Sequence, residues 1–155
     1  MAQTAAAKPA SGERPSLTLT RRFRARPEKV WAAWTDPEKL IAWFCTAKAK
    51  PGSFRADLDV RVGGLYRISF DMADSGEYSE VGGVYREVVP NERLVFTWAW
   101  HSTPERESLV TVSIKPDGAG ALMIFTHEQF FDETARDNHS KGWNELFTQL
   151  ETVLA

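Results

Sequence analysis

The sequence predicts an α+β domain in which a curved antiparallel sheet of about seven strands surrounds a long C-terminal helix, with two short helices after the first strand. Apolar residues near the C-terminus recur at steps of three and four, which is typical of an amphipathic helix. From Phe54 to Phe130 the apolar period is two, which predicts strands. A sheet of this length must bury one face, and the terminal helix is the only element large enough to cover it.

The terminal helix is expected over about 132–155. Its inward face contains Ala135, His139, Gly142, Trp143, Leu146, Leu150, Val153 and Leu154, whereas Arg136, Lys141, Glu145, Gln149 and Glu151 fall on other faces. Asp132 is a suitable N-cap residue. Gly142 is unfavourable in mid-helix by roughly 1 kcal/mol relative to alanine. We therefore expect either a close packing contact or an open space beside Gly142.

The first strand is predicted from Leu17 to Arg24, where apolar and polar residues alternate for most of its length. Pro27 is well placed as the first residue of a short helix. The tripeptide Thr35-Asp36-Pro37 provides a cap and a proline for a second short helix that ends near Phe44.

The remaining strands form a predicted meander with short turns. They are expected at Phe54–Arg61, Tyr66–Met72, Tyr78–Val89, Leu94–Trp100, Ser108–Lys115 and the segment of Met123, Phe125 and His127. The pair Gly82-Gly83 suggests a bulge or bend inside its strand. Residues 101–107 are expected to form a loop.

Length and composition limit the organisation of the chain. With 155 residues and 17.5 kDa, the chain is long enough for one buried core and too short for two ordinary domains. We expect a disordered tail over 1–16, where alanines are interrupted by prolines and polar residues, and one folded domain over 17–155.

Charge and cysteine content exclude several classes of partner. A formal net charge of −2 provides no attraction to a phosphate backbone, so nucleic acid is not an expected partner. No apolar run has the length of a membrane span. The single cysteine, Cys45, is expected to be a small buried hydrophobe in a cytoplasmic protein. Three histidines and one cysteine without paired spacing predict no metal site, and no cofactor is expected.

Several motifs, spaced over about 17–154, resemble those of a known family. They are Arg26-Pro27 with Val30-Trp31, Trp34-Thr35-Asp36-Pro37-Glu38, Asp59-Val60-Arg61-Val62-Gly63-Gly64, the segment from Gly83 to Leu94, Thr126-His127-Glu128, and the segment from His139 to Leu146. In these the chain is similar to the activator of heat-shock protein 90 ATPase homologues of the START-like (SRPBCC) superfamily. This resemblance implies a helix-grip, Bet v-like fold. The relatives that it most resembles are small bacterial proteins without established catalytic residues.

The resemblance, the aromatic inner face of the sheet and Gly142 together favour a cavity for a small hydrophobic or aromatic ligand. The expected lining residues are Tyr66, Phe70, Met72, Trp98, Trp100, Met123, Phe125, His127, His139, Gly142 and Trp143. The alternative is that these side chains simply fill the core.

Two other functions remain open. The family name implies an interaction module that acts on a chaperone in a stress response, although the eukaryotic namesakes carry an additional N-terminal domain that we do not expect here. The superfamily also includes cyclases and aromatases, which would give His127 or His139 the role of acid or base with Tyr66 or Arg67 assisting. We expect binding rather than catalysis, because no residue is spaced to complete a nucleophilic site. The protein is expected to be a monomer or a homodimer.

Overall fold

The computed structural model describes residues 14–44 and 48–155, so Cys45 and most of the predicted N-terminal tail lie outside the described residues. The elements, in chain order, are β1 (Leu17–Phe23), α1 (Pro27–Thr35), α2 (Pro37–Phe44), β2 (Arg55–Leu58), β3 (Leu65–Asp71), β4 (Tyr78–Val89), β5 (Arg93–Trp100), the 3-10 helix η1 (Pro104–Arg106), β6 (Ser108–Asp117), β7 (Gly120–Glu128) and α3 (Glu133–Val153). The predicted fold class is confirmed.

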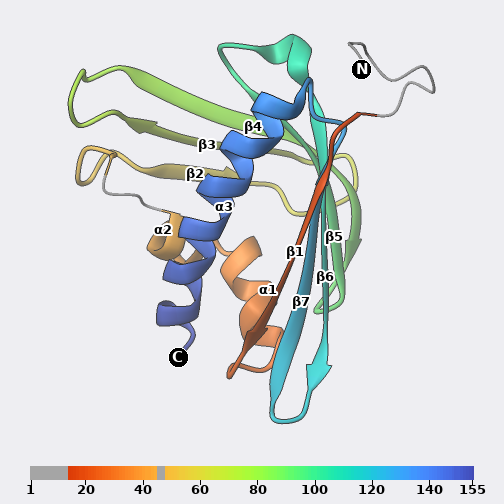
Figure 1. Cartoon of the computed structure of the whole chain (residues 1–155). Helices are drawn as coiled ribbons and strands as arrows, with labels where there is room; N and C mark the ends of the chain where they lie inside the picture. The colour runs from red at the N-terminus through yellow and green to blue at the C-terminus, as the bar shows by residue number, and fades with distance from the viewer. Residues whose placement is uncertain (1–13, 45–47) are drawn as a thin grey trace.

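The seven strands form one antiparallel sheet in the order β1-β7-β6-β5-β4-β3-β2. Strands β2 to β7 form the predicted meander, and β1 pairs with β7 at the far edge. The connection through α1 and α2 therefore carries the chain from one edge of the sheet to the other. In Figure 1, α3 crosses the hollow of the bent sheet, and α1 and α2 lie toward the C-terminal end of α3.

The helix starts follow the local sequence. Pro27 and Pro37 are the first residues of α1 and α2, and the Asp36 carboxylate accepts a hydrogen bond from the backbone N–H of Glu38 at 3.0 Å. The Asp132 carboxylate accepts one from the N–H of Ala135 at 2.8 Å, which makes Asp132 the N-cap of α3 as predicted.

Most strand boundaries lie within two residues of the sequence prediction, and larger differences in detail occur in β2, in the loop after β5 and in β4. Strand β2 ends at Leu58 rather than Arg61, because Asp59 to Gly64 form a turn in which the N–H of Gly64 donates to the carbonyl of Arg61 at 2.8 Å. The loop after β5 contains η1. The register shift in β4 lies between Tyr85 and Glu87 rather than at the glycine pair.

A tryptophan from α1 lies at the centre of the core. The ring of Trp34 is stacked on Phe125 of β7 and tilted against Trp143 of α3, with ring centroids 6.0 Å and 6.1 Å apart. The Nε1–H of Trp34 also donates a hydrogen bond to the sulfur of Met123 at 3.4 Å. Helix α1 thus covers β6 and β7, whereas α3 packs against β1 and α2. None of the helices in the described ranges is long and apolar enough to cross a membrane.

Candidate functional site: a cavity between the sheet and α3

A cavity of about 650 Å³ lies between α3, the end of α2, and the inner faces of β3 and β5. It is lined by Phe44, Lys48, Phe54, Phe70, Met72, Trp98, Trp100, Asn138, His139, Gly142, Trp143, Glu145, Leu146 and Gln149. Its volume lies within the range of about 300–1,000 Å³ that is usual for small-molecule sites.

The position of Gly142 accounts for part of this space. A Cβ atom placed on Gly142 would meet no atom within 4 Å, apart from its own helix backbone. Of the two explanations for a mid-helix glycine, close packing and open space, the structure shows the second. The side chain that is absent here leaves room on the face of α3 that is directed at the sheet.

Six of the fourteen residues that line the cavity are phenylalanine or tryptophan. Phe54 and Phe70 are stacked, with ring centroids 4.7 Å apart and planes 11° from parallel. Trp98 lies 5.0 Å from Trp143 and 6.3 Å from Phe44, measured between ring centroids. Rigid rings of this kind offer a large contact area to a flat apolar molecule at a small cost in side-chain entropy.

Polar groups are found on α3 at this cavity. Glu145 and Gln149 were expected on other faces of the helix, but both line the cavity, since they follow Gly142 at steps of three and seven. The Gln149 amide donates to the carbonyl of Trp43 at 2.8 Å. Glu145, Asn138 and Lys48 are exposed.

His139 joins α3 to β5 from inside the cavity. Its Nδ1 lies 2.7 Å from the carbonyl oxygen of Ala135, one turn earlier in α3, so Nδ1 carries the proton and donates it. Its Nε2 is then an acceptor, and it receives the indole N–H groups of Trp100 at 3.1 Å and Trp98 at 3.3 Å. Burial lowers the pKa of His139, and a second proton on Nε2 would face two N–H donors.

His127 occupies a different environment. It is fully buried, its Nδ1 accepts the indole N–H of Trp143 at 3.0 Å, and its Nε2 lies 2.7 Å from the hydroxyl of Ser108. Burial, and secondarily His139, lower the pKa of His127 to about 2. Both ring nitrogens are therefore occupied in a neutral histidine that connects β7, β6 and α3.

Ten of the eleven predicted cavity residues fall into two groups, and Tyr66 lies elsewhere. Those that line the cavity are Phe70, Met72, Trp98, Trp100, His139, Gly142 and Trp143. Met123, Phe125 and His127 face the same side of the sheet, but they are completely buried and do not line it. Trp34 of α1 covers Met123 and Phe125, whereas the ring of His127 is enclosed by Phe130, His139 and Trp143.

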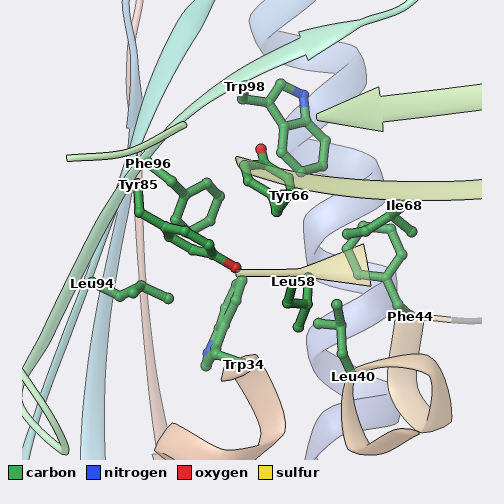
Figure 2. Close-up of a pocket in the computed structure, with 10 residues that line it drawn as sticks. All are labelled: Trp34, Leu40, Phe44, Leu58, Tyr66, Ile68, Tyr85, Leu94, Phe96 and Trp98. Carbon is green, nitrogen blue, oxygen red and sulfur yellow. The ribbon is translucent and has the colours of Figure 1, made fainter. Parts of the chain in front are cut away.

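Tyr66 lies at a second, much smaller pocket of about 20 Å³, which shares Phe44 and Trp98 with the cavity (Figure 2). The Tyr66 hydroxyl donates to the carbonyl of Thr97 at 2.6 Å, and burial raises the pKa of Tyr66 well above its usual value. The hydroxyl of Tyr85 is directed toward Trp34 and Leu58 in Figure 2. This pocket has room for about one water molecule.

The residues named for a catalytic alternative do not meet in the cavity. Arg67 is exposed and pairs with Asp57 at 2.9 Å, while its sheet neighbour Tyr66 is buried on the other face. In the described part of the chain, no three His, Cys, Asp or Glu side chains are grouped closely enough to hold a metal ion.

Sequence reasoning missed seven lining residues, Phe44, Lys48, Phe54, Asn138, Glu145, Leu146 and Gln149. For the residues of α3 the spacing from Gly142 was a usable signal. For Phe44 and Phe54 no signal was available, since they reach the cavity only through the packing of α2 and of the segment before β2.

Comparison with known proteins supports the fold assignment. A family model described as Activator of Hsp90 ATPase homolog 1-like protein matches residues 24–155. The chain has no match among curated proteins.

Many solved structures are similar. Protein CV1439 from Chromobacterium violaceum superimposes with a TM-score of 0.75 at 29% identity, over 90% of this chain and 97% of that one. Mll3558 from Rhizobium loti has a TM-score of 0.74 and 25% sequence identity, and the match covers 89% of this chain and 95% of that one. MLL2253 from Mesorhizobium loti has a TM-score of 0.72 and 25% sequence identity, and the match covers 90% of this chain and 96% of that one.

Proposed function

The chain belongs to the Activator of Hsp90 ATPase homolog 1-like family, and from this fold and its cavity we propose that it is a binding protein for a small hydrophobic or aromatic molecule. The molecule occupies the space between the sheet and α3. The observation that supports this most directly is the cavity of about 650 Å³ beside Gly142. Protein interiors are close-packed, and a space of this size next to a helix glycine is not needed for stability.

The chemistry of the walls favours an apolar guest. The aromatic rings and Met72 form an apolar surface, and the polar side chains that line the cavity include the exposed Lys48, Asn138 and Glu145. A guest that buries its apolar surface here gains roughly 25 cal/mol for each Å² removed from water. The absence of a completed nucleophilic site in the cavity favours binding over turnover.

The proposal is tested by filling the space at Gly142. In the wild type, a binding aromatic compound at a hundredfold excess over its Kd should raise the free energy of unfolding by about 2.7 kcal/mol. Replacing Gly142→Phe should abolish this stabilisation, because the new ring takes the place of the guest. Gly142→Ala is the matched control, since it also replaces the helix-unfavourable glycine but adds only one methyl group. Screening by thermal shift, followed by calorimetry, measures both effects.

The opposite outcome is also clear. If aromatic compounds, lipids and aromatic acids all leave the wild type unshifted, or if Gly142→Phe binds as well as Gly142→Ala, the guest does not occupy this cavity.

Family membership supports a second candidate, contact with a chaperone protein. The purified protein would then stimulate the ATPase of a bacterial chaperone in a titration, and Gly142→Phe would leave that stimulation unchanged because the cavity is not needed for it. A flat titration would remove this candidate. The single cysteine fits a cytoplasmic location for either role.

A further inference from the structure

Where Trp98, Trp100 and His139 line the cavity, indole donors outnumber the acceptor that they share. Trp98 and Trp100 alternate along β5 and therefore direct their rings to the same side of the sheet, toward α3. Both indole N–H groups are directed to a single atom, Nε2 of His139. An indole nitrogen can donate but cannot accept.

His139 can satisfy only one of these donors fully. Its Nδ1 proton is committed to the carbonyl of Ala135 at 2.7 Å, which leaves one lone pair on Nε2. Trp100 approaches it at 3.1 Å and Trp98 at 3.3 Å, so the two donors share one acceptor. Sharing leaves one indole N–H under-bonded, and a donor in the protein interior without a full partner is destabilising.

All three residues line the cavity, and Trp98 is almost completely buried. We propose that this end of the cavity is a subsite for an acceptor oxygen, such as the carbonyl of a flat aromatic ketone, which takes the surplus indole N–H that His139 cannot satisfy. The proposal rests on the proposed binding function and specifies the chemical class of the guest. Apolar rings on the guest contact the aromatic walls, and its oxygen is directed to the tryptophan pair.

Two rigid probes of the same skeleton isolate this oxygen. Fluorene and 9-fluorenone are both flat three-ring molecules that differ at one carbon, where the ketone carries a carbonyl. The wild type should bind fluorenone about threefold to tenfold more tightly than fluorene, as expected for one neutral hydrogen bond. The ketone is also the better solvated of the two in water, so a preference for it cannot come from the hydrophobic effect.

Two substitutions should move this preference in opposite directions. In Trp100→Phe only one indole N–H remains, His139 satisfies it, and the ratio of the two Kd values should fall to about one. In His139→Leu both indole N–H groups lose their acceptor, and the preference for the ketone should increase. Trp31→Phe on α1, outside the cavity lining, is the matched control and should keep the wild-type ratio. Because Trp100 is only half-buried, its variant tests the proposal even if His139→Leu does not fold.

The failures are distinguishable. Equal Kd values for both probes in the wild type, or an unchanged ratio in Trp100→Phe, overturn the subsite while leaving the binding function intact. If neither probe binds the wild type, the subsite and the aromatic guest are both overturned.

Discussion

His127 shows how a single residue can be fixed by its partners. Because Trp143 donates to Nδ1, the ring proton must lie on Nε2, which donates to the hydroxyl of Ser108 at 2.7 Å. The Ser108 hydroxyl then donates to the carbonyl of Trp98 at 3.2 Å. This chain of hydrogen bonds is complete only when His127 is neutral, and it connects α3 with three adjacent strands. His127 therefore acts as an anchor between helix and sheet.

The neutral state of His127 predicts a dependence of stability on pH. Its pKa is about 2 in the folded protein and about 6.5 when unfolded, so the unfolded chain binds the proton more readily. The stabilisation is complete above pH 6.5 and is lost as the pH falls. Between pH 7.5 and 4.5 this group should remove about 2.7 kcal/mol from the free energy of unfolding.

Urea unfolding at pH 7.5, 6.5, 5.5 and 4.5 measures this effect. His127→Gln can still accept from Trp143 and donate to Ser108, but it does not titrate, so its stability should decline less steeply below pH 6.5. His101→Gln, at an exposed position in the turn after β5, should follow the wild type. Parallel curves for wild type and His127→Gln would contradict the assignment.

At the scale of the element, Gly83 and Gly142 are both glycines inside regular structure, and their surroundings are opposite. A Cβ atom on Gly83 of β4 would collide with the carbonyl oxygen and the hydroxyl of Thr97 on β5. The Thr97 hydroxyl accepts the backbone N–H of Val84 at 2.9 Å, which holds the two strands at this close approach. The extra residue of the bulge is Arg86, which is exposed.

The same substitution should therefore have opposite effects at the two positions. Gly83→Ala should destabilise the protein by about 1–3 kcal/mol, because the backbone of β5 must move. Gly142→Ala should stabilise it by up to about 1 kcal/mol, because alanine is the better helix former and meets nothing. Denaturant unfolding of both variants compares them directly, and effects of the same sign would show that the surroundings of one glycine are misassigned.

At the scale of the whole molecule, α3 packs against a core that α1 helps to build together with the sheet. The ring of Trp34 packs against rings from α2, the sheet and α3. The distances between ring centroids are 4.9 Å to Trp43 of α2, 6.1 Å to Phe96 of β5 and 6.2 Å to Phe147 of α3. The core is thus filled on the β6 and β7 side, and the cavity is confined to the side of β3 and β5.

Removing this ring should affect the whole fold. Trp34→Ala should lower the free energy of unfolding by about 3–5 kcal/mol. The total free energy of unfolding of a domain is only about 5–15 kcal/mol, so this is a large share of it. Trp31→Ala on the same helix is the control, since Trp31 is only partly buried against the core, and its cost should be less than half as large. Equal losses in chemical unfolding would show that Trp34 is not the centre of the packing.

Much of this fold was contained in local sequence signals. Periodicity predicted the order of the elements, and the prolines and aspartates marked where the helices begin. Gly142 indicated either close packing or open space beside α3. Each of these signals depends on residues only a few positions apart.

What the tertiary structure alone decided is which inward-facing residues line the cavity and which are sealed in the core. Alternation along a strand assigns Phe70 and Phe125 to the inner face equally, but α1 covers only the second of them. The partners of His127 and His139 likewise come from distant strands. A two-residue period specifies the face of a sheet; the element that lies over each position depends on contacts between segments far apart in the chain.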